Sequence, residues 1–462
     1  MDGPRLNERR SEVLVETLRK FLQRDARANI SKLLGRIRPA DVAGLLRSLG
    51  RDEQLEVFRI LTHDFPEGAG EALTEMEPPQ RLALLERLEA EEIAAVLERL
   101  AVDDAVFLVE SLPEELHVKV LSLVDLRNLT DVQTHLAYRD DTAGRIMSLE
   151  YFALPETATA REAIAAIQEQ SDAEMIFYLY VVDGEGHLVG VTSLRQLLLS
   201  SPDRTLSSFM TRATIKVHTD TDQEEVAQLA ARYDLLAIPV TDDGNHLVGI
   251  VTVDDIVDVV KEEATEDLLK MAGTSEEELL YERRSLRIAR LRLPSVLVSM
   301  VGLLVTGLLL QNFQAEMGKA LFLLAFVPVV MGLGGSIGGQ ASTVTVRGLA
   351  SGRIGRDDRP IRTFLGQQLR VGAILGAACA ALVGVAAGAM TANVAAGLTV
   401  GGAVFVALVV AAIAGAVVPL SFQKLGIDPA VASGPLLSTV TDITGILIYY
   451  GLAAWLLLRL GG

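Results

Sequence analysis

The chain has 462 residues and a formal net charge of −18. Residues 286–462 carry 12 basic and 5 acidic side chains, a net charge of +7, which leaves a net charge of −25 on residues 1–285. Such an acidic first part argues against nucleic acid as a partner and suits metal cations, although the need for solubility alone would also explain it.

Cysteine content and the start of the chain restrict the compartment. The single cysteine, Cys379, allows neither a disulfide nor a cysteine-based metal site within one chain. The first ten residues have no apolar core and do not form a secretory signal. We therefore expect residues 1–285 to be cytoplasmic.

Residues 1–135 have the pattern of a helical-repeat domain. Segments of two to three turns recur between residues 25 and 130, with apolar side chains at i, i+3 and i+4 spacing and prolines between them. Each segment would bury its apolar face against the next, which predicts a superhelix. The clearest segments are 40–49, 81–88, 92–100 and 104–112.

Residues 136–268 contain a duplicated α/β unit. Residues 178–197 recur as residues 236–256, and each copy predicts a strand, a glycine-containing turn, a second strand and a helix. A helical stretch precedes each copy, at 160–168 and 224–233. His187 and His246 occupy equivalent turn positions, so we expect them to support the fold and not to bind metal.

The duplicated unit resembles the cystathionine-β-synthase (CBS) module, which usually pairs two copies into a nucleotide- or ion-sensing unit. The module's ribose-contacting pattern, Thr/Ser-x-x-Asp, is present at Thr252 and Asp255. The first copy has Thr192 but carries Arg195 in place of the aspartate. The resemblance thus implies one nucleotide site, for ATP, unless Asp255 serves a metal site instead.

An acidic segment, residues 254–267, follows the second copy. Like charges at i,i+4 oppose a helix by about 0.2–0.5 kcal/mol per pair. A hard divalent cation would neutralise them, and a solvated acidic helix is the alternative. The connecting helix expected over residues 269–292 starts acidic and ends basic, which suits the helix dipole and a place at the membrane surface.

Residues 293–462 contain five apolar stretches that are long enough to cross about 30 Å of hydrocarbon. They are 293–311, 319–346, 370–392, 395–421 and 432–458. Basic residues gather before the first stretch and between the second and third, and Lys424 lies between the fourth and fifth. The positive-inside rule therefore predicts a cytoplasmic N-terminus and a C-terminus outside.

The second stretch is rich in glycine. Five glycines and Pro328 lie within residues 326–343, and they should weaken or bend a helix. Irregular backbone at membrane depth is tolerated where it is buried in protein or lines water. Small residues also permit close helix packing, so pore lining and packing both remain open for this stretch.

Asp442 is the single acidic residue of the last apolar stretch. An ionised carboxylate at bilayer depth costs about 2.5–3.5 kcal/mol on insertion scales, so it is rarely left facing lipid. Ser438, Thr439, Thr441 and Thr444 offer hard oxygen nearby. The pattern predicts a hydrated cation pathway, and the alternative is a packing aspartate bonded to these hydroxyls.

The order of these parts resembles the MgtE-type magnesium transporter family over essentially the whole chain. Three motifs carry the resemblance: Gly144-Arg-Ile-Met147, the segment from Pro328 to Gln340, and a final hairpin with Asp428-Pro429, Ser433-Gly-Pro435 and Thr441-Asp442-Ile-Thr-Gly445. It implies a multidomain membrane protein built from a cytoplasmic α-helical superhelix (1–135), an α/β tandem CBS repeat (136–268), an amphipathic connecting helix (269–292) and a five-helix transmembrane domain (293–462).

The resemblance also implies roles for particular residues. Two chains would form one pore in the inner (plasma) membrane, and Asp442 would hold hydrated Mg²⁺ there. The other matching pore residues are Gly434, Ser438, Thr439 and Ser336. Intracellular Mg²⁺ would bind acidic residues and close the pore, and the matching positions are Glu224, Asp234, Asp255, Asp258, Glu263, Glu266, Asp267, Asp428 and Asp103.

The chain departs from the family pattern at three positions. Ser336 and Gly339 stand where the signature has asparagine, and Gln368 replaces a frequent glutamate. A broader divalent preference, including Mn²⁺ or Co²⁺, therefore stays open. A membrane-anchored CBS sensor without transport is the other alternative. The sequence shows no nucleophile–base pair or phosphate-cradling loop, so we do not expect an enzyme.

Overall fold

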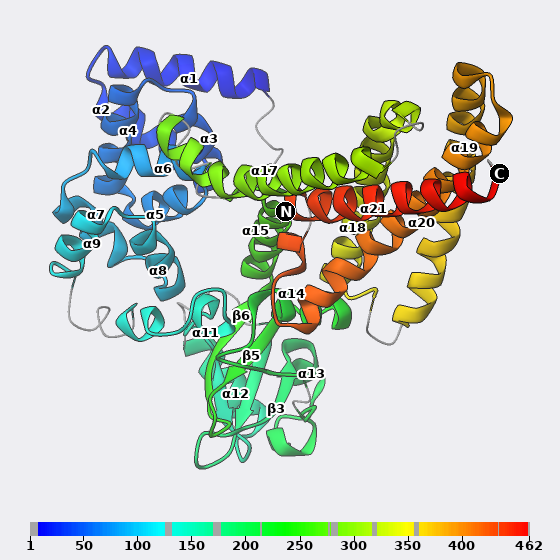
Figure 1. Ribbon diagram of the computed structural model, residues 1–462. Coiled ribbons are helices and arrows are strands. Elements are labelled where there is room, and N and C mark those ends of the chain that lie inside the picture. The colour runs from blue at the N-terminus through cyan, green and yellow to red at the C-terminus, as the bar shows by residue number, and fades with distance from the viewer. Residues whose placement is uncertain are drawn as a thin grey trace. The chain divides into compact units, whose positions relative to one another are not determined.

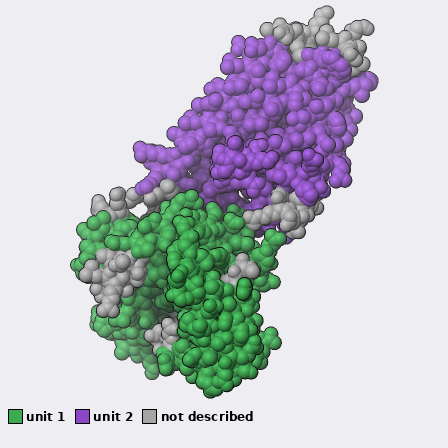
Figure 2. All heavy atoms as spheres, turned by 90° about the horizontal axis from the view of Figure 1, so that it is seen from below, with its two compact units in different colours: residues 1–261 green, residues 262–462 purple. Residues whose placement is uncertain are grey.

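The computed structural model describes residues 8–124, 132–169, 177–212, 215–275, 278, 285–316, 321–354, 360–432 and 434–460. The chain divides into two compact units, residues 1–261 and 262–462, which Figure 2 shows in green and purple. Helix α15 (Val253–Ala272) contains the point of division.

The first part of unit 1 is a stack of short helices (Figure 1). Prolines occupy the first turns of α3, α5 and α6, where a missing N–H leaves no intrahelical bond unmade. The segments predicted from apolar spacing correspond to α3, α6, α7 and α8. The helices are α1 (Glu8–Leu22), α2 (Arg27–Leu34), α3 (Pro39–Arg47), α4 (Arg51–Asp64), α5 (Pro66–Thr74), α6 (Pro78–Leu85), α7 (Ala90–Leu97), α8 (Val102–Glu110) and α9 (Glu114–Leu121).

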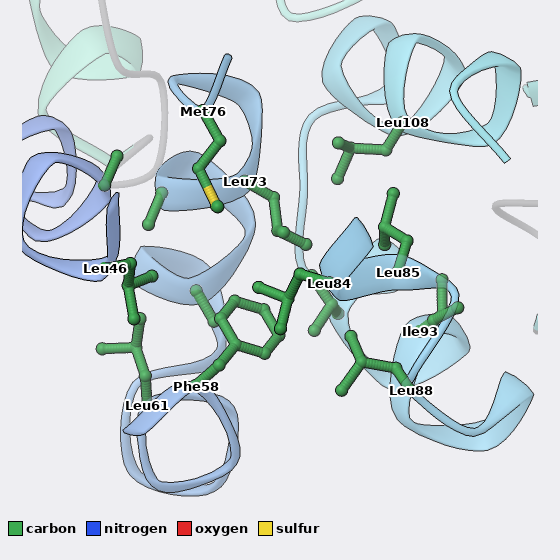
Figure 3. Packing of buried hydrophobic residues seen from close by; sticks show 14 of the residues in the cluster. Leu46, Phe58, Leu61, Leu73, Met76, Leu84, Leu85, Leu88, Ile93 and Leu108 are labelled. Atoms are coloured by element: carbon green, nitrogen blue, oxygen red, sulfur yellow. The ribbon is translucent and has the colours of Figure 1, made fainter. Parts of the chain in front are cut away.

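These helices share one apolar core, because each is too short to bury its own face. Phe58 lies fully buried near its centre, with Leu46 and Leu61 on one side and Leu84 on the other (Figure 3). The core continues to Leu108 of α8, so all the predicted repeat segments contribute to it. The helical-repeat prediction is thereby confirmed.

The second part of unit 1 holds two three-stranded sheets, one for each copy of the α/β unit. In each sheet a short first strand pairs parallel with the second strand, which pairs antiparallel with the third. The first strands were missed in the sequence, because three- and two-residue segments show no period. The strands are β1 (Ala153–Pro155), β2 (Tyr178–Val182), β3 (Leu188–Ser193), β4 (Val217–His218), β5 (Ala237–Thr241) and β6 (Leu247–Thr252).

Short helices complete each copy. They are α11 (Ala143–Ile146), α12 (Ala160–Glu169), α13 (Leu194–Leu199), η1 (Leu206–Ser208) and α14 (Gln223–Tyr233), followed by α15. Tyr180 and Leu188 of the first copy pack with Leu247 and Ile250 of the second in a common core. At the turns, the rings of His187 and His246 stack with their centroids 4.6 Å apart.

Among the described residues of unit 2, five helices are long and apolar enough to cross a membrane. In the most apolar 18-residue segment of α20, 56% of the residues are buried. The corresponding shares are 11% in α17 and 17% in α19, so α20 is the central helix. It packs against α18, α19 and α21 (Figure 1). The elements are α17 (Ser285–Glu316), η2 (Leu321–Phe326), α18 (Val327–Ala350), α19 (Ile361–Thr391), α20 (Val394–Lys424), η3 (Pro429–Ala432) and α21 (Pro435–Leu460).

The expected connecting helix lies partly outside the described residues, which omit 276–277 and 279–284. Its last part, residues 285–292, forms the first two turns of α17 and is continuous with the first span. Arg287, Arg290 and Arg292 therefore lie on the same helix as the apolar residues that follow.

The glycines expected to weaken or bend the second span do not interrupt its helix. Helix α18 is unbroken from Val327 to Ala350, with Pro328 in its first turn, where proline is tolerated. The glycines instead allow close packing at particular positions. A Cβ on Gly415 of α20 would lie 2.2 Å from the carbonyl oxygen of Gly338, and a Cβ on Gly338 would lie 2.8 Å from Thr441 Cγ2.

We predict that Gly415→Ala destabilises the protein by about 1–3 kcal/mol, because the added methyl group meets backbone that cannot move aside. A thermal melt of the purified full chain in detergent measures this. Gly332→Ala in α18 is the matched control, since no atom lies within 4 Å of its added Cβ. Equal melting temperatures for the two variants would contradict this account of the helix contact.

Candidate functional site

Asp442 lies on α21, and its side chain is half-buried in the single chain. The neighbouring hydroxyls do not bond to it. Ser438 Oγ donates to the carbonyl of Gly434 (3.1 Å), Thr439 Oγ1 to that of Pro435 (2.9 Å), and Thr444 Oγ1 to that of Val440 (2.6 Å). Within the described part of the chain, no hydrogen bond or ion pair to the Asp442 carboxylate is present. Its local hydroxyls are thus used by the helix backbone.

The other predicted pore residues lie in different surroundings. Ser438 is exposed one helical turn before Asp442, and Ser336 is exposed on α18. Thr439 instead packs against α17, where a Cβ on Gly302 would lie 2.3 Å from Thr439 Cγ2. Ser438 and Asp442 therefore share an open face of α21, whereas Thr439 contributes to a helix contact.

Gly434 has a backbone role, because its conformation and its surroundings both disfavour a side chain. It has a left-handed φ of +59°, and a Cβ there would lie 2.2 Å from the carbonyl oxygen of Met271. Gly273, with φ +79°, lies close to Pro435, since its Cβ would be 2.9 Å from Pro435 Cγ. These two glycines bring the end of α15 against the start of α21.

Acidic residues of α15 and of the loop before η3 meet in unit 2. We call Glu266, Asp267 and Asp428 the inner acidic cluster. Lys270 Nζ lies 2.5 Å from Glu266 Oε1 and 2.6 Å from Asp428 Oδ2. Burial, and then the Asp428 carboxylate, raises the pKa of Asp267 to about 6. Burial alone would lower the pKa of the Lys270 ammonium. The hydrogen bonds from Lys270 to Asp428 and Glu266 outweigh the effect of burial and raise this pKa.

A second group of carboxylates lies in unit 1. Burial, and then the charge of Asp255, raises the pKa of Asp103 well above its usual range. Its Oδ1 atom is fully buried, with no hydrogen-bond partner among the described residues. Burial raises the pKa of Asp255 to about 7, although the Thr252 hydroxyl donates to that carboxylate. Sequence reasoning missed Asp104, whose charge acts on both, although its place beside Asp103 could have signalled it.

The remaining predicted sensing residues are not brought into these groups. Asp258 is exposed and pairs with Lys261 (2.5 Å). Asp234 ends α14 in a left-handed conformation, with φ +52°. Glu224 lies in the first turn of α14, and Glu263 lies on α15. In the ranges described above, no three or more His, Cys, Asp or Glu side chains of one chain are arranged to hold a metal ion.

The predicted nucleotide pattern differs between the two copies as expected. Thr252 and Asp255 are hydrogen-bonded to each other at the end of β6. In the first copy, Gln196 takes the place of the acid: its side chain accepts from the backbone of Ser193 (3.2 Å), and Arg195 makes no such bond. Asp255 is thus shared between the nucleotide pattern and the carboxylate group with Asp103.

The fold and these sites define a class of protein. Five apolar helices with an unpaired carboxylate on the last one, joined to an acidic unit with a tandem sensor-like repeat, are typical of a regulated ion transporter of the membrane. Comparison with protein families supports this class. Residues 327–452 match the divalent cation transporter family MgtE, residues 37–141 match the MgtE intracellular N domain, and residues 143–202 and 206–262 match CBS domains.

Individual relatives give the family. The chain is 36% identical to the magnesium transporter MgtE of Thermus thermophilus over 96% of this chain and 99% of the relative. It is 38% identical to that of Enterococcus faecalis over 70% of this chain and 71% of the relative. The chain belongs to the MgtE family of magnesium transporters, whose matched descriptions are of a transporter and not of an enzyme.

Two solved structures resemble about half of the chain. A crystal structure of the soluble part of a magnesium transporter has a TM-score of 0.51 and 33% identity, and covers 55% of this chain and 99% of its own. The cytosolic domain of the Mg²⁺ channel MgtE in complex with ATP has a TM-score of 0.50 and 34% identity, and covers 53% of this chain and 99% of its own.

The raised pKa of Asp255 predicts a pH dependence of stability when divalent cations are chelated. The ordinary pKa of an aspartate side chain is 3.8, but folded Asp255 holds its proton up to about pH 7. The stability that the neutral carboxyl group contributes to the folded state is therefore complete below pH 3.8. It is lost as pH rises through about 7. Melting temperatures of the full chain in EDTA should therefore fall between pH 5.5 and 8, and Asp255→Asn should flatten this decline.

Glu91→Gln, an exposed position on α7, provides the control and should keep the wild-type profile. A decline of the same size in Asp255→Asn would assign the pH dependence to other groups.

Proposed function

We propose that this protein is a Mg²⁺ channel of the inner (plasma) membrane in which two copies form one pore beside Asp442. The observation that carries the proposal is the half-buried carboxylate of Asp442, which lies on a membrane-crossing helix and has no bonded partner among the described residues. A charge in that position requires water, a cation or a second copy nearby.

The chemistry of Mg²⁺ suits such a site. The ion gives up its water reluctantly and is usually bound through one or two carboxylates with several waters retained. A pair of Asp442 carboxylates, one from each copy, would attract the hydrated ion without trapping it, as conduction requires. Ser438, on the same open face of α21, would bond a hydrating water.

A second copy would also cover apolar surface that is exposed in the single chain. Among the exposed large apolar side chains are many on α17, including Leu304 (61% exposed) and Leu308 (62%). Lipid or a second copy would cover them. The basic residues before α17 and between α18 and α19 favour the cytoplasmic side for the N-terminus and the outer side for the C-terminus.

Intracellular Mg²⁺ would close the pore through the acidic groups. Mg²⁺ bound by the inner acidic cluster would hold the end of α15 against the loop at Asp428, and another ion would serve Asp103 and Asp255. The other proposed ligands are Glu224, Asp234, Asp258 and Glu263. When Mg²⁺ is scarce, repulsion between the carboxylates would favour an open arrangement, so the ion acts by its different affinity for the two states.

ATP would bias the same equilibrium from the second copy of the α/β unit. The hydrogen-bonded Thr252 and Asp255 support one site, and the likeness to an ATP-bound cytosolic domain supports the ligand. Because Asp255 would serve either ATP or a metal, the two ligands would influence each other.

Ion selectivity has a specific alternative. Ser336 and Gly339 provide a hydroxyl and bare backbone where the family has amides, and Gln368 is a buried amide on α19. Fewer side-chain acceptors would discriminate less strictly among hydrated ions, so transport of Mn²⁺ or Co²⁺ beside Mg²⁺ is the second candidate function.

Asp442→Ala should reduce Mg²⁺ uptake into liposomes by at least about tenfold, because the variant loses the charge that concentrates the cation. Uptake is measured with a Mg²⁺-sensitive dye inside the vesicles. Asp442→Glu keeps the charge and should retain more uptake than the alanine variant. Equal Mg²⁺ uptake above that of protein-free liposomes by wild type and Asp442→Ala would reject Asp442 as the pore residue. Wild-type uptake no greater than that of protein-free liposomes would leave a sensor without transport as the remaining function.

Neutralising Glu263, Glu266 and Asp267 together, as Gln, Gln and Asn, should leave the channel conducting at high internal Mg²⁺. The variant removes the charges that the ion would bridge, so closure would need a higher Mg²⁺ concentration, by about tenfold or more. Flux is measured as internal Mg²⁺ is raised, with the exposed pair Glu91 and Asp203 neutralised as a control. Inhibition at the wild-type concentration would reject the sensor.

A further inference from the structure

Lys270 occupies the inner acidic cluster. Its Nζ atom donates to Asp428 Oδ2 at 2.6 Å and lies 2.5 Å from Glu266 Oε1, one helical turn earlier. The other oxygen of Asp428 accepts the backbone N–H of Ala430 at 2.7 Å. Both oxygens of Asp428 are therefore engaged, and one of them is held by an ammonium from α15.

The charges explain why a cation belongs here. Three carboxylates gather around one ammonium, and Arg347 adds a further positive charge that acts on Asp267. Without Lys270 the carboxylates would repel one another, which would separate α15 from the loop at Asp428. A lysine ammonium is a compact point charge, so it resembles a metal ion more closely than a planar guanidinium does.

We propose that Lys270 is a tethered cation that takes the place of the divalent ion in the inner acidic cluster. It bridges Glu266 and Asp428 when Mg²⁺ is scarce and must leave Asp428 before Mg²⁺ can bind there. This inference rests on the proposed cation site at Glu266, Asp267 and Asp428. A single positive charge neutralises less of the cluster than a divalent ion, so the bridge made by Lys270 is the weaker one.

The location of Lys270 links its replacement by Mg²⁺ to α21, the helix that carries Asp442. Met271, the next residue, has its carbonyl oxygen against Gly434, and Gly273 lies against Pro435 at the start of α21. Separation of α15 from Asp428 therefore acts on the end of the helix that carries Asp442. Lys270 sets how firmly this contact holds in the absence of Mg²⁺.

The test measures hydrogen exchange of the full chain in detergent, in EDTA and in saturating Mg²⁺, over peptides that cover residues 262–275 and 426–435. In EDTA, Lys270→Met should speed exchange in both segments by about fivefold or more, because the carboxylates are no longer bridged. In Mg²⁺, the difference from wild type should disappear, because the divalent ion replaces the missing charge. Mg²⁺ uptake at low internal Mg²⁺ should rise in the same variant.

Two variants control for charge and for folding. Lys270→Arg keeps a cation in the cluster and should stay within about twofold of wild type in both conditions. Lys424→Met removes the same charge from an exposed position at the end of α20 and should change neither segment.

The outcomes separate this proposal from the proposed function. If Lys270→Met speeds hydrogen exchange equally in EDTA and in Mg²⁺, Lys270 is an ordinary structural ion-pair partner and the inference is overturned. The inference is also overturned if Lys270→Met does not speed hydrogen exchange in EDTA. If Mg²⁺ slows exchange equally in wild type and in Asp428→Asn, the cluster is not a cation site. The role of Lys270 and the proposed closure of the pore through this cluster then both fail, whereas the pore assignment to Asp442 is unaffected. If Asp428→Asn abolishes that slowing but Lys270→Met behaves as a structural variant, only the role of Lys270 is rejected.

Discussion

Carboxylates gathered where water is scarce constrain both units of this protein. Burial raises the pKa of Asp103, Asp255 and Asp267, so each pays a desolvation cost for its charge at neutral pH. Asp442 adds a carboxylate on a membrane-crossing helix. Under the proposed function, a hydrated divalent cation would lower this cost at each of these places, so one ion could serve both transport and sensing.

Glycines allow the close helix contacts around Asp442 and at the end of α15. Gly338 lets Thr441 approach α18, and Gly302 lets Thr439 approach α17, so α21 is fixed on both sides of Asp442. Gly434 and Gly273 do the same for the end of α15. In the glycine-rich span, Gly338 therefore serves packing, while the helix is continuous from Val327 to Ala350.

The two regulatory groups differ in what balances their charge. The inner acidic cluster already contains Lys270, whereas Asp103 keeps a buried oxygen without a partner in the described residues. Under the proposed function, a cation would displace the Lys270 ammonium in the first group and would bind the buried carboxylate oxygen of Asp103 in the second. The responses of the two groups to Mg²⁺ are expected to differ for this reason.

The sequence by itself determined the helical repeat, the duplicated α/β unit, the five spans and the family, because apolar period, repetition and motif order are local properties of the chain. It also singled out Asp442 and Asp428. Only the tertiary structure decided that Asp104 acts on both Asp103 and Asp255, that Lys270 bridges Glu266 and Asp428, and that α18 stays an unbroken helix. The contact between Lys270 and Asp428 joins residues 158 positions apart in the sequence. Burial and charge act through space, so they produce no periodic pattern that the sequence alone would show.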